Sequence, residues 1–490
     1  MLFTSLDFFL FLLVTLLLFA AAPARTRWLL LLVASCVFYG YTRPTNLLYL
    51  GGLFFAAWLA ASALQRSDEP GRRRLLLAAG LTGVLGSLVV FKFFDFFAGE
   101  IERGLNHWLA AEAHVALPRL GLAAPAGYSF IAFAAASFLI DTYRRKIVPN
   151  ASAFGVATYL AWFPKILAGP IERATTFLPR MAGALRPTPE QIVLGSQLIV
   201  WGLFKKVVIA DNLAPVVDHA FGIVAFASPI ELALAVYFFA FQIYCDFSGY
   251  TDIAIGVSLL FGVELMENFR RPYLSQSTAE FWGERWHISL GHWFRDYLYI
   301  PLGGSRAGTT RLYVNLMIVF LVSGLWHAGL GYGVGWSFLV WGALNGAYQC
   351  AGVATRPLWT RLGTRWPSVA SAWWWRLLRI LVTFHLIAVT WIFFRAKSIG
   401  DAWTVMRKIG AHAGEFPALL GSYPFTVGDY LGAALIALLL VVELVDERRS
   451  IFQRLAAAPV AIRWGMVYAA LGALAILGHW QVREFIYMQF

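Results

Sequence analysis

Hydrophobic residues form long continuous runs along this chain, rather than alternating with polar residues. A membrane-spanning helix needs about 20 predominantly apolar residues, so the runs predict transmembrane helices. These are expected at residues 5–22, 27–41, 45–64, 75–97, 124–141, 152–168, 191–210, 229–263, 312–328, 334–352, 377–394, 427–445 and 462–480. The run at 229–263 is long enough for one span or two. Several of the other segments are short or interrupted, so about 11 to 14 spans are expected in total.

Composition agrees with a membrane protein. Of the 490 residues, 59% are hydrophobic and 13% are charged, against about 25% charged residues in a soluble domain. The three cysteines, Cys36, Cys245 and Cys350, are far apart and form no spacing typical of a zinc site or a disulfide framework. The first run contains Asp7 and is preceded by no Lys or Arg, which predicts a transmembrane helix rather than a cleaved signal peptide.

Basic residues fall on every second connection between the early spans. These connections contain Arg25, Arg27, Arg66, Arg72, Arg73, Arg74, Arg144, Arg145 and Lys146. By the positive-inside rule, the loops at 66–74 and 142–150 are cytoplasmic and the N-terminus is outside. The net charge of +12 therefore indicates membrane orientation, and no nucleic-acid partner is expected.

Two carboxylates, Asp246 and Asp252, lie in the apolar segment 244–252, which also contains Ser248 and Tyr250. An ionisable group at membrane depth is costly unless it faces protein or water, so both are functional candidates. The alternative, which the neighbouring hydroxyls favour, is that they accept hydrogen bonds that hold an interrupted helix together.

Segment 278–301 has two stripes when it is read as one helix. The apolar stripe contains Trp282, Trp286, Leu290, Trp293 and Tyr297, and the polar stripe contains Glu280, Glu284, His287, Gly291 and Arg295. Such a helix lies in the interface plane or lines a wet cavity. His287 is a functional candidate because of its charged neighbours, and an ordinary hydrogen-bonded side chain is the open alternative.

A second histidine stands where an apolar run ends, at Trp326-His327, before the glycine-rich segment 329–335. Neutral imidazole can take a proton from a hydroxyl near neutral pH, although His327 could instead cap the preceding helix. The motifs GxSxG, HEXXH and GxxxxGK[ST] are absent. His287 and His292 are not spaced to share one helix face, so no metal site is expected.

At these residues the sequence resembles the membrane-bound O-acyltransferase family. It is most similar to the bacterial branch that includes the alginate O-acetyltransferase membrane component and the teichoic acid D-alanyl transfer protein. The resemblance lies in residues 163–173, 202–212, 246–252, 267–273, 285–289, 295–299, 325–327, 391–395 and 485–490. The sequence of residues 299–304 is more similar to that of the polysaccharide-acetylating members.

The resemblance implies an all-α polytopic membrane protein, with a ring of transmembrane and re-entrant helices around a central tunnel. One domain would span 1–490, with N-terminal helices at 1–123, a catalytic core at 124–352 and C-terminal helices at 353–490. His327 would be the catalytic base, supported by His287. The tunnel and its substrate contacts are expected to include Asn345, Trp326, Trp286, Asp296, Arg295, Asp246, Ser248, Tyr250 and Asp252.

The chain departs from the family pattern in two places. One extra residue separates Phe281-Trp282 from Arg285-Trp-His287, and an extra residue rotates a helix by about 100°. Gly283 is expected to absorb it in a bulge. Asn345 stands where alginate-type members often have histidine, and asparagine can orient a group but cannot act as a base.

The expected reaction is acetyl transfer from a cytoplasmic thioester, acetyl-CoA, to a hydroxyl of an exported polysaccharide or cell-wall polymer. Transfer would occur directly or through a separate periplasmic or extracellular partner, in the bacterial inner membrane. No permanently bound cofactor is expected. The alternatives are D-alanyl transfer, acylation of a lipid or of peptidoglycan, a transporter whose path contains the intramembrane ionisable residues, and a scaffold for envelope enzymes.

Overall fold

The computed structural model describes residues 1–109, 114–122, 124–147, 152–183, 185–306, 308–328, 335–448, 450–480, 483, 485 and 486. Within these residues the secondary structure is helical, apart from one β-bridge between Phe269 and Trp286. The all-α prediction is therefore confirmed. The chain divides into two compact units, residues 1–191 with 258–265, and residues 192–257 with 266–490. Residues 329–334 of the glycine-rich segment and 487–490 of the terminal motif lie outside the described residues.

In the described part of the chain, 8 helices are long and apolar enough to cross a membrane. They are Asn46–Arg66, Pro70–Trp108, Pro189–Gly222, Pro229–Leu260, Thr309–His327, Trp373–Arg395, Val427–Arg448 and Val460–Leu477. Two shorter apolar helices, Leu6–Ala21 and Tyr128–Tyr143, coincide with predicted spans. The protein is thus a multi-pass membrane protein, and the run at 229–263 forms one helix rather than two.

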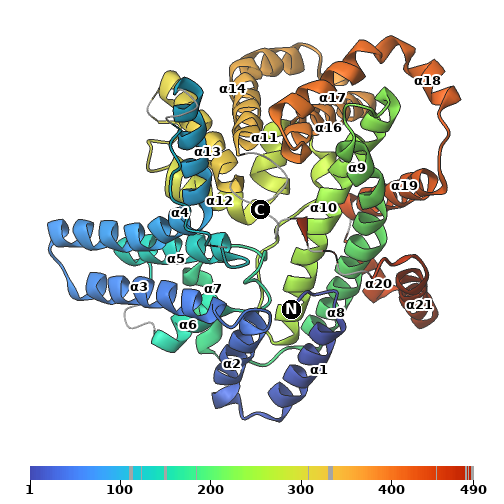
Figure 1. The fold of residues 1–490 in the computed structure, drawn as a ribbon. Helices are drawn as coiled ribbons and strands as arrows, with labels where there is room; N and C mark the ends of the chain where they lie inside the picture. Colours follow the sequence, from blue (N-terminus) through green and yellow to red (C-terminus); the bar gives the residue numbers. More distant parts are fainter. Residues whose placement is uncertain are drawn as a thin grey trace. The chain divides into compact units, whose positions relative to one another are not determined.

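The first unit contains helices α1 to α7 and the end of α10 (Figure 1). Their bounds are α1 Leu6–Ala21, α2 Arg27–Gly40, α3 Asn46–Arg66, α4 Pro70–Trp108, α5 Tyr128–Tyr143, α6 Ala153–Ala161 and α7 Ala174–Ala182. Helices α3, α4 and α5 pack against one another. The buried guanidinium of Arg73 donates hydrogen bonds to the carbonyls of Leu64 (2.5 Å), Ser67 (2.9 Å) and Tyr143 (2.7 Å). Arg73 therefore joins the C-terminal ends of α3 and α5.

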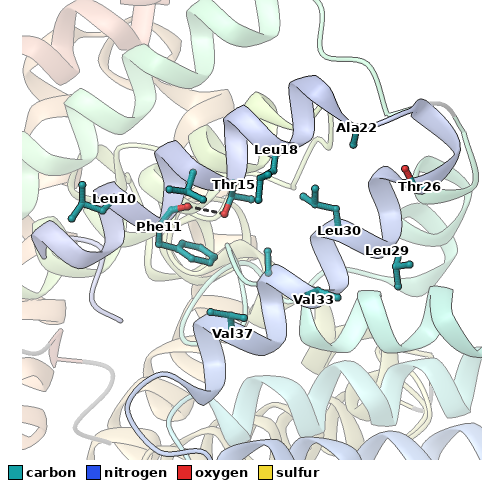
Figure 2. Close-up of a pocket in the computed structure, with 12 residues that line it drawn as sticks. Leu10, Phe11, Thr15, Leu18, Ala22, Thr26, Leu29, Leu30, Val33 and Val37 are labelled. Atoms are coloured by element: carbon teal, nitrogen blue, oxygen red, sulfur yellow. Dashed lines mark hydrogen bonds between the residues drawn. The ribbon is translucent and has the colours of Figure 1, made fainter.

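A groove of about 610 Å³ lies between α1 and α2. Figure 2 shows apolar side chains such as Leu10, Leu18 and Val33 along it. Its polar Thr15 is already satisfied, because the hydroxyl donates to the carbonyl of Phe11 at 2.7 Å. An apolar surface of this kind is favourable against lipid chains and unfavourable against water.

The second unit contains most of α8 and α10 and the rest of the chain. The bounds are α8 Pro189–Leu203, η3 Phe204–Ala210, α9 Asp211–Gly222, α10 Pro229–Leu260, η4 Pro272–Leu274, α11 Thr278–Glu280, η5 Phe281–Arg285, α12 Ile288–Phe294, η6 Arg295–Tyr299, α13 Thr309–His327, α14 Trp336–Arg365, α15 Pro367–Ala370, α16 Trp373–Arg395, α17 Ile399–Ala411, η7 Ala413–Glu415, α18 Phe416–Ser422, α19 Val427–Arg448, α20 Ile451–Ala457 and α21 Val460–Leu477.

Helices α13 and α14 lie in backbone contact. A side chain at Gly324 would clash with the carbonyl of Phe338, and one at Gly342 would clash with the carbonyl of Phe320. Small residues allow this close approach, which is a common basis of helix association in membranes. The same device joins α8 to α10, where Gly202 meets the carbonyl of Gly249.

The single helix predicted over 278–301 is wrong. The segment is divided into α11, η5, α12 and η6, because His287 has a left-handed backbone with φ of 46°. The turn η5 is π-helical, with the Trp286 N–H donating to the Phe281 carbonyl at 2.8 Å. A π-helical turn accommodates one more residue than an α-helical turn. The bulge expected at Gly283 takes this form.

Candidate active site

His287 and His327 line one cavity of about 240 Å³ in the second unit. Segment 279–299 forms one part of the wall, and the face of α13 that carries Phe320 and Ser323 forms another. Small-molecule sites typically enclose about 300–1,000 Å³, so this cavity is small. The structure thus brings together the two histidines that the sequence singled out separately.

His327 is the last residue of α13 and is 3% exposed. Its ring centroid lies 4.7 Å from that of Trp326, 5.3 Å from that of Phe394 and 5.4 Å from that of Trp341. Aromatic side chains therefore restrict the access of water to this imidazole. A base in such surroundings is preorganised, because little solvent must rearrange when a proton moves.

His287 is also 3% exposed. Its ring contacts Phe247, with centroids 4.8 Å apart, and lies 6.4 Å from the ring of Trp326. Trp326 therefore contacts both histidines. Burial lowers the pKa of His287 to about 3, because an apolar environment disfavours the charged imidazolium. His287 is neutral at physiological pH.

Backbone hydrogen bonds on both sides of His287 hold its unusual conformation. The Arg270 N–H donates to the Arg285 carbonyl at 2.9 Å, and the Ile288 N–H donates to the Asn268 carbonyl at 3.0 Å. A left-handed non-glycine residue costs about 1–3 kcal/mol and persists only where the surroundings fix it. The pairing of segments 268–270 and 285–288 supplies that constraint.

Ion pairs attach the same segment to the last turn of α19. Arg285 binds Glu447 through both terminal nitrogens, at 3.1 and 2.8 Å, and its Nε contacts Glu280 at 2.7 Å. Arg271 pairs with Asp446 and, through Nε at 2.7 Å, with Glu447. These five residues are called the α19 ion-pair cluster below. Bidentate pairs of this kind fix orientation as well as distance.

Asn345 is fully buried on α14, behind the cavity wall. Its Oδ1 accepts a hydrogen bond from the Trp282 indole at 2.9 Å, and its Nδ2 donates to the Trp341 carbonyl at 2.9 Å. Trp282 itself lines the cavity, as does Trp286. Asn345 therefore orients an aromatic side chain of the wall.

Arg295 lines the cavity and pairs with the adjacent Asp296 at 2.8 Å. Their side chains are 55% and 31% exposed, so this pair is solvated. Asp296 is not among the lining residues in the part of the chain that the structure describes.

The four candidates on α10 lie in a separate ion-pair network. Lys205 contacts Asp252 at 2.6 Å and donates to Ser248 at 2.9 Å, and Lys206 contacts Asp246 at 2.7 Å. The two lysines are consecutive residues of the π-helical turn η3. The helix that carries the two carboxylates, α10, is unbroken. Asp246 and Asp252 are paired with the lysines of η3, and they do not hold an interrupted helix together.

Lys206 also pairs with Asp211 at 3.0 Å. Further contacts of this network involve residues 485 and 486, near the end of the chain. The Asp246 carboxylate accepts a hydrogen bond from the Ile486 N–H at 2.7 Å. The ring of Phe485 packs edge-on against Tyr250, with centroids 4.7 Å apart, and against the ammonium of Lys206. None of the α10 candidates is among the described residues that line the cavity.

Several residues of the cavity and of the α10 ion-pair network were not predicted from the sequence. The signal for Lys205 and Lys206 was available, because two cations in the run 191–210 require partners, and the carboxylates of α10 are the opposite charges. Phe320 could not be identified from the sequence, because an apolar residue that lines a cavity cannot be distinguished from the other apolar residues of a span. Gln349 of the cavity wall could have been noticed as an amide in the otherwise apolar run 334–352.

The donor set offers no evident metal site. Across the described ranges, no group of three or more His, Cys, Asp and Glu side chains is placed to hold a metal ion.

Comparisons with known proteins agree with this architecture. Residues 36–394 match the membrane-bound O-acyltransferase family. A protein called Probable alginate O-acetylase AlgI, from Azotobacter vinelandii, is 34% identical over 95% of this chain and 90% of its own length. The peptidoglycan O-acetyltransferase of Helicobacter pylori is 32% identical over 78% and 72%, and the teichoic acid D-alanyltransferase of Bacillus subtilis is 23% identical over 55% and 68%. This chain therefore belongs to the membrane-bound O-acyltransferase family and is a multi-pass membrane O-acyltransferase.

Proposed function

We propose that this protein transfers an acetyl group from acetyl-CoA, a cytoplasmic thioester, to a hydroxyl of an exported polysaccharide or cell-wall polymer. The observation that carries this proposal is that His287 and His327 line one cavity, in a member of an O-acyltransferase family. The relatives named for O-acetylation are 34% and 32% identical, whereas the D-alanyltransferase is 23% identical. This difference favours acetyl over D-alanyl transfer.

In the proposed reaction, the imidazole of His327 takes the proton of the acceptor hydroxyl, and the hydroxyl oxygen attacks the thioester carbonyl. The C–S bond then breaks, the thiolate takes the proton from the imidazolium, and the new ester is released. His287, being neutral, orients the acceptor or stabilises the developing oxyanion by a hydrogen bond. The thioester supplies the driving force, so no ion gradient is needed.

The proposed setting is the bacterial inner membrane, with the N-terminus outside. A single domain, in which a ring of helices surrounds a tunnel open to both faces, would let the donor enter from the cytoplasm and the acceptor from the other side. The remaining predicted residues, Trp326, Asp296 and the α10 network, would support the tunnel rather than react. A separate periplasmic or extracellular partner would complete transfer to the polymer.

The first test is His327→Ala in cells, with His385→Ala as the control, because His385 is an exposed histidine bonded to Tyr237 and Leu381. Base-released acetate from the envelope polymer is measured at matched membrane abundance. Loss of a general base costs about 10²–10⁴-fold, so His327→Ala should nearly abolish acetylation while His385→Ala should retain it. Undiminished acetylation in His327→Ala would exclude His327 as the base. Alanine esters in place of acetate would support D-alanyl transfer.

A further inference from the structure

We propose that Trp282, held in place by Asn345, limits the length of the acyl group that this site transfers. The inference rests on the proposed function, acyl transfer in the cavity of His287 and His327, and adds the residues that restrict the donor to short-chain acyl thioesters. It assigns a specificity role to two residues that do not take part in proton transfer.

The size of the cavity is the first observation. It measures about 240 Å³, whereas an apolar cavity of about 150 Å³ holds one benzene molecule. The space beside the histidines therefore has room for a small acyl group with its thioester, whereas a long alkyl chain would have to extend beyond it. Bulky aromatic side chains, Trp282, Trp286 and Phe320, form part of its wall.

The second observation is that Trp282 is fixed at both its apolar and its polar edges. Its ring centroid lies 5.3 Å from that of Trp341 and 5.9 Å from that of Phe320. Its indole N–H donates to Asn345 Oδ1 at 2.9 Å. Asn345 is itself fixed by its hydrogen bond to the Trp341 carbonyl. The ring therefore cannot rotate out of the cavity without leaving a buried amide oxygen unpaired.

The neighbouring tryptophans differ from Trp282 in both respects. Trp341 and Trp391 belong to the same aromatic cluster, but neither is among the residues that line the cavity. Their indole N–H groups have no hydrogen-bond partner among the described residues. Trp282 thus combines a position on the wall with a polar anchor, and Trp391 provides a matched control.

The expected selectivity is large. A hydrophobic pocket discriminates by about 10–200-fold for each methylene group that does not fit. The wild-type protein should therefore use acetyl thioester much better than butyryl or hexanoyl thioester. Removing the indole, or releasing it by removing the Asn345 carbonyl oxygen, should reduce this preference.

The experiment uses membrane vesicles that contain the full chain and its endogenous envelope polymer. Acetyl-, butyryl- and hexanoyl-coenzyme A are supplied separately, and the ester-linked acyl groups are released by mild base and quantified by mass spectrometry. Trp282→Leu and Asn345→Leu should raise the ratio of butyryl to acetyl transfer by about tenfold or more. Asn345→His, which restores a hydrogen-bond acceptor, and Trp391→Phe should leave the ratio close to that of the wild type.

The outcomes separate this inference from the proposed function. If the wild-type vesicles form no acetyl ester, the proposed function fails whatever the variants do. If the wild type forms acetyl esters and both leucine variants, present at normal abundance, keep its chain-length ratio, the inference is overturned. An equal rise in Trp391→Phe would also overturn it, because the effect would then be a general loosening of the aromatic cluster. Asn345→Leu keeps the test valid if Trp282→Leu does not fold.

Discussion

His287 illustrates what one residue contributes and what its local sequence does not reveal. Its charged neighbours marked it as a functional candidate, but its backbone φ of 46° and its burial could not be predicted. Both depend on segment 268–270, with which residues 285–288 pair. A pattern read within one window cannot include a partner from another part of the chain.

The low pKa of His287, about 3, predicts how pH acts on this residue. The ordinary value is about 6.5, so as pH falls the unfolded chain binds this proton first. His287 therefore lowers folding stability progressively below that ordinary value, and it has no effect on stability above it. Between about pH 5 and 8 its imidazole stays neutral in the folded protein.

His287→Asn tests whether the imidazole of His287 stays neutral between about pH 5 and 8. Asparagine tolerates a left-handed backbone and does not titrate in this range, so the variant removes the imidazole without a new backbone conflict. The rate of ester formation should fall by about tenfold or more, whereas the shape of its profile between about pH 5 and 8 should not change. An acid inflection that is present in the wild type and absent in the variant would show that His287 titrates there.

Asn345 shows a residue property that the sequence did predict. An asparagine can orient a group and cannot act as a base at neutral pH, and its side chain does orient Trp282. The identity of that partner could not be predicted, because Trp282 lies on a different element and is brought close only by the packing of segment 278–299 onto α14.

At the scale of elements, apolar run length was a good guide to the position of several helices. The predicted spans at 5–22, 27–41 and 427–445 correspond to α1, α2 and α19 within a few residues. An exception is the predicted span 152–168, whose helix α6 covers only Ala153–Ala161. A second prediction, made from helical period, also fails, because the stripes of segment 278–301 do not lie on one helix. Its short turns are instead stabilised by ion pairs and a β-bridge to distant residues, which periodicity does not encode.

The α19 ion-pair cluster gives a prediction at this scale. Glu447→Gln removes the charge that binds Arg285 and Arg271, so the segment that carries His287 should lose its fixed orientation. We expect kcat for ester formation to fall by about tenfold, or about 1.4 kcal/mol of transition-state stabilisation, with a smaller change in KM.

Glu267→Gln is the matched control, because Glu267 pairs with Arg270 while both side chains are half-exposed. Exposed pairs contribute about 0–1 kcal/mol, so its kcat should stay close to the wild-type value. Equal effects of the two substitutions on kcat, at equal membrane abundance, would contradict a positioning role for the α19 ion-pair cluster.

For the whole molecule, the distribution of basic residues carries most of the information about orientation. One basic residue counted under the positive-inside rule also has a structural role. Arg73 is buried and binds three backbone carbonyls, so one of the cations counted for orientation is also a structural residue. Composition alone cannot make that distinction, because it depends on where the ends of α3 and α5 meet.

The predicted orientation can be measured with single cysteines in a variant that lacks Cys36, Cys245 and Cys350. Thr42→Cys, between α2 and α3, should react with a membrane-impermeant maleimide added to intact cells. Glu69→Cys, between α3 and α4, should react only after the membrane is opened, because the positive-inside rule makes that loop cytoplasmic. Both positions are exposed. The reverse labelling pattern would mean that the N-terminus is inside.

The backbone contact between α13 and α14 restricts how the site can move. Because a carbonyl lies against each of Gly324 and Gly342, sliding the two helices past each other would bring side chains against backbone. Displacement of the facing segment 278–299, which is divided into short turns, would widen the cavity and leave this contact intact. We therefore expect substrate entry and product release, which often limit turnover, to depend on that segment rather than on the helix that carries His327.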